Sequence, residues 1–156
     1  MRTFMMYNIY IMVSISFYFY WYHTIIEDRK GKMAIKVLAA VFLLYGLFSL
    51  MKWDGAGLQK YTFMVGAVFT LICALLHFRQ LLQSDDALNL SRTLPFWVST
   101  GLLLFNIGMV PYMLLSDYLN FRNNIYSIVI LLLLNFILYG CFSIGFIWSR
   151  EKPNRF

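Results

Sequence analysis

The chain has 156 residues and a formal net charge of +6; 61% of its residues are hydrophobic and 13% are charged. Soluble domains are usually about 45–50% apolar and about 25% charged, so this composition excludes a soluble domain. The basic residues stand at the ends of long apolar runs, and no basic patch stands apart from them. This arrangement argues against nucleic-acid binding and favours membrane lipids as partners.

Five apolar stretches meet the length that a membrane-spanning helix needs, roughly 20 residues. They cover about 4–26, 33–51, 61–82, 96–116 and 125–148. Runs such as IVILLLL do not alternate between apolar and polar residues, which excludes the strands of a membrane barrel. We therefore predict an all-α integral membrane bundle of five transmembrane helices that forms a single domain over residues 1–156.

The first stretch, 4–26, resembles a signal peptide only in its early Arg2. Its apolar region is too long and ends in no small-residue cleavage site, so we predict a retained span. The aromatic run FYFYWYH at 17–23 is typical of the membrane–water interface.

The third stretch, 61–82, carries a stripe of small residues at four-residue spacing: Gly66, Thr70 and Ala74. Small residues let helix backbones approach closely in lipid, so this stripe predicts a packing face. Cys73 and His77 also lie four residues apart, on one face of the same helix.

The fourth stretch, 96–116, combines Gly101 and Gly108, seven residues apart, with a central Asn106 and with Pro111. Proline removes the hydrogen bond to the residue four positions earlier, Ile107, and can kink a helix. We expect a packed, bent joint whose face is buried against protein or water.

The fifth stretch, 125–148, has Asn135 near its middle and a packing pair at Cys141 and Gly145. Asn106 and Asn135 are expected at one depth on neighbouring antiparallel helices. A hydrogen bond between the two amides, worth about 0.6–2 kcal/mol, is the favoured interpretation. A polar lining for a solute path is the alternative.

Metal or haem binding has three weak candidates: His23, Cys73 and His77. Zinc needs four ligands, and the pattern supplies no fourth, so we predict no cofactor. Neither G-x-S-x-G nor H-E-x-x-H occurs, and the chain is expected not to be an enzyme.

Orientation follows from the distribution of Lys and Arg. On one side of a five-span topology lie four basic residues, Arg2, Lys52, Lys60 and Arg122. The other side has nine: Arg29, Lys30, Lys32, Lys36, Arg79, Arg92, Arg150, Lys152 and Arg155. The basic-rich side stays in the cytoplasm, which predicts an outside N-terminus and a cytoplasmic C-terminus.

Four segments of the chain look familiar: YNIYIMVSISFYFY at 7–20, YTFMVGAVFTLICALLHFRQLL at 61–82, LPFWVSTGLLLFNIGMVPYMLLSDYL at 94–119 and LNFILYGCFSIGFIW at 134–148. In them the chain resembles a family of small multi-pass membrane proteins common in Bacteroidetes. The resemblance implies a bacterial inner membrane and an association with signalling or envelope systems, and it brings no catalytic residues. Members of that family commonly have two further spans ahead of the segment at Tyr7, which implies a short or N-terminally trimmed member.

No ionisable side chain lies near the centre of any expected span, which argues against ion-coupled transport. The favoured function is a non-catalytic inner-membrane sensor, scaffold or partner subunit that acts through helix contacts, as a homo-oligomer or with another membrane protein. A channel or passive carrier with a polar midplane site at Asn106 and Asn135 is the first alternative. Binding of a lipid, a quinone or haem is a further one.

Overall fold

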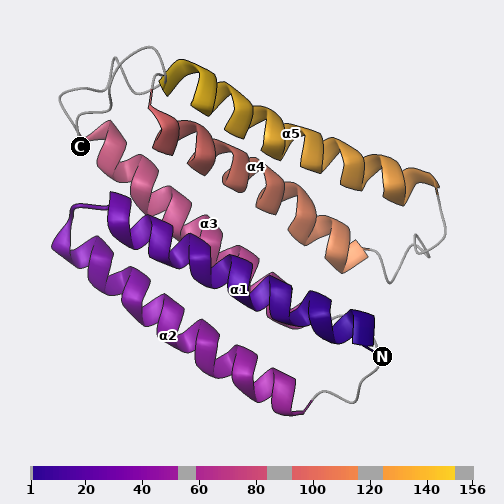
Figure 1. Cartoon of the computed structure of the whole chain (residues 1–156). Coiled ribbons are helices and arrows are strands. Elements are labelled where there is room, and N and C mark those ends of the chain that lie inside the picture. Colours follow the sequence, from indigo (N-terminus) through magenta and orange to yellow (C-terminus); the bar gives the residue numbers. More distant parts are fainter. Residues whose placement is uncertain (1, 53–58, 84–92, 116–124, 150–156) are drawn as a thin grey trace. The chain divides into compact units, whose positions relative to one another are not determined.

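The computed structural model describes residues 2–52, 59–83, 93–115 and 125–149, and helices make up nearly all of this part of the chain. Figure 1 shows the five helices: α1 (Arg2–Ile25), α2 (Arg29–Met51), α3 (Lys60–Leu82), α4 (Leu94–Leu115) and α5 (Ile125–Ser149). No strand occurs in the described residues. The all-α fold class predicted from the sequence is therefore confirmed.

Four of the five helices are long and apolar enough to cross a membrane: α2, α3, α4 and α5. Helix α1 does not reach the same hydropathy, although its length matches the others. Its lower hydropathy has a visible cause, since five tyrosines, Asn8 and His23 lie along it. Four of the five expected spans are thus confirmed as helices long and apolar enough to cross a membrane. The span expected at 4–26 stays a prediction.

The chain divides into two compact units, Met1–Cys73 and Ala74–Phe156. The first unit contains α1, α2 and most of α3, and the second contains the end of α3, α4 and α5. We describe each unit by itself. The expectation of a single domain remains a prediction.

A tight turn joins α1 to α2 in the first unit. Asp28 is the N-cap of α2, because its carboxylate accepts hydrogen bonds from the backbone N–H groups of Lys30 (3.3 Å) and Gly31 (3.1 Å). A side chain at Gly31 would lie 2.9 Å from Ile26 Cγ2, so the turn needs glycine there. The cap explains why α2 begins at Arg29, ahead of the expected apolar start at 33.

The core of the first unit follows a seven-residue repeat along α1. The buried positions alternate in steps of four and three: Asn8, Met12, Ile15, Phe19, Tyr22 and Ile26. Such a repeat is typical of helices that pack side by side at a small crossing angle. Phe19 meets Phe42 of α2 edge to face, with 5.7 Å between ring centroids.

Small residues on α2 and α3 accommodate this row of α1 side chains. A Cβ at Gly46 would lie 2.6 Å from Met12 Cε, and one at Gly66 would collide with Ile15 Cδ1 and lie 2.9 Å from Phe42 Cε2. At Gly66 the backbone of α3 therefore lies against side chains of both α1 and α2. Helices α1 and α2 form an antiparallel hairpin (Figure 1).

Candidate functional site

The seam between α4 and α5 is the most extensive helix contact of the second unit (Figure 1). A Cβ at Gly101 would lie 3.0 Å from Cys141 Cβ and 3.3 Å from the Leu138 carbonyl oxygen, and one at Gly145 would lie 2.8 Å from Trp97 Cβ. The two backbones are therefore close enough that only glycine fits at these positions without a shift.

These contacts define an antiparallel register. Trp97 lies against Gly145, Gly101 against Cys141, and Gly108 against Leu134. Each step forward along α4 is matched by an equal step back along α5. A Cβ at Gly108 would collide with Leu134 Cδ2, the far end of a flexible side chain, so this contact is the most yielding of the three.

Asn106 and Asn135 lie at one level in this register, but their amides do not bond to each other. The Asn106 amide nitrogen donates to the Leu102 carbonyl oxygen at 2.7 Å, and that of Asn135 donates to the Leu131 carbonyl oxygen at 2.8 Å. Each donor is thus satisfied four residues back in its own helix. The hydrogen bond expected between the amides is absent from the described residues.

Pro111 lies inside α4, which continues to Leu115. Pro111 is exposed on the surface of the chain, and Ile107, the residue that loses its hydrogen bond to proline, is 53% exposed. This face is thus uncovered within the described chain, and the expectation that it is buried against protein or water stays a prediction. Exposure follows from register, since Asn106 and Met109, on the other side of α4, take the buried positions.

The pair of His77 and Ser99 joins the end of α3 to α4. His77 Nδ1 and Ser99 Oγ are 2.8 Å apart, and both residues are buried. From the sequence, His77 was only a weak candidate for metal or haem binding, and Ser99 was not predicted as its partner. The available signal in the sequence was the Ser99 hydroxyl itself, a polar group about one and a half turns after the start of α4.

Aromatic rings continue from this pair towards α5. Phe78 meets Phe96 at 5.8 Å between centroids, Phe96 meets Trp97 at 5.7 Å, and Trp97 meets Trp148 at 5.8 Å, all nearly edge to face. These rings lie on three different helices, so they tie the ends of α3, α4 and α5 together. Such pairs contribute about 0.5–1.5 kcal/mol each beyond burial.

The remaining packing candidates of the sequence lie on α3. The Thr70 hydroxyl donates to the Gly66 carbonyl oxygen at 2.8 Å, and Ala74 is buried. Cys73 and Cys141 are free thiols. Among the described residues, no group of three or more His, Cys, Asp and Glu side chains could hold a metal ion, and this finding includes His23, Cys73 and His77.

A polar cluster that the sequence reading missed lies in the first unit, where α1 begins, α2 ends and α3 begins. Gln59 donates from its backbone N–H to Asn8 Oδ1 at 3.0 Å and from Nε2 to the Ser49 carbonyl oxygen at 3.0 Å. Thr62 Oγ1 lies 3.0 Å from Ser49 Oγ and 3.2 Å from Gln59 Oε1. One hydroxyl proton cannot serve both contacts, so Ser49 donates to Thr62 and Thr62 donates to Gln59.

Asn8 is 2% exposed, and its Nδ2 has no hydrogen-bond partner in the described structure. Flipping the amide would not help, because Oδ1 is held by the Gln59 N–H donor. The cluster closes one end of the unit with bonds between three helix ends. What it can do chemically is hold these ends in register.

Comparisons of the chain with protein-family models, with curated proteins and with solved structures gave no match. The resemblance to a Bacteroidetes membrane family therefore stays a prediction.

Proposed function

We propose that the chain is a non-catalytic membrane subunit that acts by binding another membrane protein, or a second copy of itself, through its outward helix faces. The observation that carries this proposal is the direction of the polar groups. Asn106, Asn135 and Thr70 donate to carbonyl oxygens of their own helices, and Ser99 bonds to His77. Polar side chains that bond within the chain in this way support a packing role, and with it the proposal of a non-catalytic subunit.

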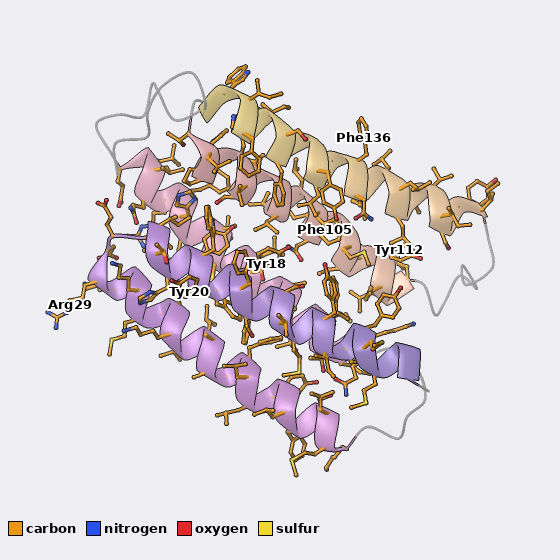
Figure 2. All side chains as sticks on the ribbon, viewed as in Figure 1. Tyr18, Tyr20, Arg29, Phe105, Tyr112 and Phe136 are labelled. Atoms are coloured by element: carbon orange, nitrogen blue, oxygen red, sulfur yellow. The ribbon has the colours of Figure 1, made fainter. Side chains whose placement is uncertain are left out.

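The outward faces support the same proposal because they are large and apolar. Figure 2 shows Phe136 projecting away from α5, and this side chain is 80% exposed. On the same helix a Cβ at Gly140 would meet nothing within 4 Å, and Ser143 is exposed. Small residues on an outward face permit close approach of another helix in lipid.

The experiment is purification of the tagged full chain from its own membrane in a mild detergent. A subunit is expected to bring a second chain, or a second copy, in a fixed molar ratio. A monodisperse monomer with no co-purifying protein would contradict the proposal.

The proposal includes α1 as a fifth span, an outside N-terminus and the bacterial inner membrane. Support for the span comes from α1 itself: no Asp, Glu, Lys or Arg occurs from Thr3 to Ile26. Its exposed side chains include Tyr10, Val13 and Phe17, which suit lipid better than water. A fluorescent-protein fusion to the C-terminus is expected to be bright and an alkaline phosphatase fusion inactive; active phosphatase would reverse the orientation.

The channel or carrier alternative, and the binding of a quinone or haem, gain no support from the described contacts. Their discriminating measurements are solute flux in reconstituted vesicles and a visible absorption spectrum of the purified chain.

A further inference from the structure

Three basic residues lie in line on one face at the beginning of α2. Arg29, Lys32 and Lys36 follow one another at intervals of three and four residues, which is one side of a helix at 3.6 residues per turn. Arg29 and Lys36 are exposed and Lys32 is half-buried. Figure 2 shows Arg29 projecting away from the ribbon.

This row of cations is not neutralised within the described chain. None of the three forms an ion pair among the described residues, and the first turn of α2 has no acidic residue. The nearest carboxylate before the helix, Asp28, is bonded to two backbone N–H groups as the N-cap. Glu27 and Asp28 are the anions at this positive end of the helix dipole, where cations are unfavourable. The four basic residues between Arg29 and Lys36 outnumber them, so this end of α2 can take a further anion as a partner.

The same face continues as an exposed apolar stripe. Ala40 is exposed, Leu43 is 42% exposed and Leu47 is 55% exposed, and all three lie in line with Arg29 and Lys36. From Lys36 to Leu47 the helix rises about 16 Å, at 1.5 Å per residue, which is close to one half of a hydrocarbon core of about 30 Å. The face therefore has positive charge at one end and, next to it, an apolar surface about as long as one leaflet is deep. This arrangement matches the anionic headgroup and the acyl chain of a lipid.

We propose that this face of α2 binds an anionic phospholipid, with its phosphate group held by Arg29, Lys32 and Lys36 and an acyl chain lying along Ala40, Leu43 and Leu47. Lys36 lies within the apolar part of the helix and reaches the headgroup by extending its alkyl stem along the helix. A free phosphate ion would use the cations but leave the stripe without a partner. The proposal requires only that α2 spans the membrane and does not depend on the partner-subunit function.

The test uses the purified full chain and native mass spectrometry, with phosphatidylglycerol and phosphatidylcholine of the same acyl chains as probes. Wild type is expected to bind phosphatidylglycerol more tightly. The variant Arg29→Gln/Lys32→Gln/Lys36→Gln is expected to lose at least about tenfold of that affinity. Equal affinity of wild type for the two lipids would overturn the proposal.

The matched control is Lys52→Gln/Lys60→Gln/Arg122→Gln, which removes the same three charges elsewhere and is expected to keep the preference. An equal loss in this control would show a net-charge effect and refute the site. The variant Lys32→Arg/Lys36→Arg keeps the charge and is expected to bind phosphatidylglycerol as tightly as wild type does, which separates recognition from misfolding. A tenfold loss of affinity in this variant would refute recognition by charge. Displacement of the lipid by inorganic phosphate at equal concentration would refute a lipid occupant.

Discussion

The variant Gly145→Ala tests the close approach of α4 and α5. The added methyl carbon would lie 2.8 Å from Trp97 Cβ and 3.1 Å from Leu94 Cδ1, whereas non-bonded carbon atoms pack at about 3.5–4.0 Å. Trp97 Cβ is attached to the backbone and cannot rotate away, so the helices must separate by up to about 1 Å. Overpacking of this kind costs about 1–3 kcal/mol.

The assay is unfolding of the purified chain by SDS titration in mixed micelles, followed by circular dichroism. Near-ultraviolet dichroism is expected to change as well, because Trp97 packs against Trp148 at 5.8 Å. The control is Gly140→Ala on the same helix, where the added methyl would meet nothing within 4 Å. It is expected to leave stability within about 0.5 kcal/mol of wild type. Equal stability of the two variants would refute the register of the seam.

Three further variants test the contacts on either side of this seam. A double-mutant cycle of Asn106→Leu and Asn135→Leu is expected to give a coupling energy below about 0.5 kcal/mol, because each amide donates to its own helix. A coupling energy above about 1 kcal/mol would indicate a direct hydrogen bond between the two amides. Gly101→Cys is expected to form a disulfide with Cys141 on oxidation, because the two Cβ atoms would lie 3.0 Å apart and need to separate by only about 0.5–1 Å to reach the Cβ distance of a disulfide, about 3.5–4.5 Å. The readout is a fall from three free thiols to one, that of Cys73; three remaining thiols would contradict the pairing. Thr62→Val is expected to lower the free energy of unfolding by about 1–2 kcal/mol. Thr62→Ser keeps the hydroxyl and is expected to have a free energy of unfolding close to that of wild type. Equal losses of stability in the two variants would show that the hydroxyl is not involved.

The positions of the helices could be predicted from the sequence because length and apolar content alone decide them in lipid. The stretch 61–82 became α3 at Lys60–Leu82, and 125–148 became α5 at Ile125–Ser149. The largest difference, at the beginning of α2, came from the cap at Asp28. A cap acts through two backbone hydrogen bonds, which a reading of apolar length does not include.

The packing faces were harder to predict because lipid-facing and buried positions are both apolar. On α1 the buried Met12, Ile15 and Phe19 alternate with the exposed Val13 and Phe17, so composition offers no contrast between the faces. Glycines were a better guide, since they permit backbone approach, as Gly145 does.

Polar partners could not be predicted because they depend on rotamers and register. Asn106 and Asn135 lie at one level, yet each amide finds an acceptor in its own helix. Gln59, by contrast, bonds to Asn8, which lies far from it in the sequence. Only the arrangement of three helix ends brings these two residues together.

Photo-crosslinking in the native membrane tests the partner-subunit proposal most directly. A benzophenone amino acid would replace one outward residue at a time: Val13 on α1, Leu44 on α2, Ile107 on α4 and Phe136 on α5, which are 62%, 70%, 53% and 80% exposed. We expect a discrete protein adduct, either a dimer of the chain or one defined partner, from at least one of these positions. Lipid adducts alone from all four positions would contradict the proposal.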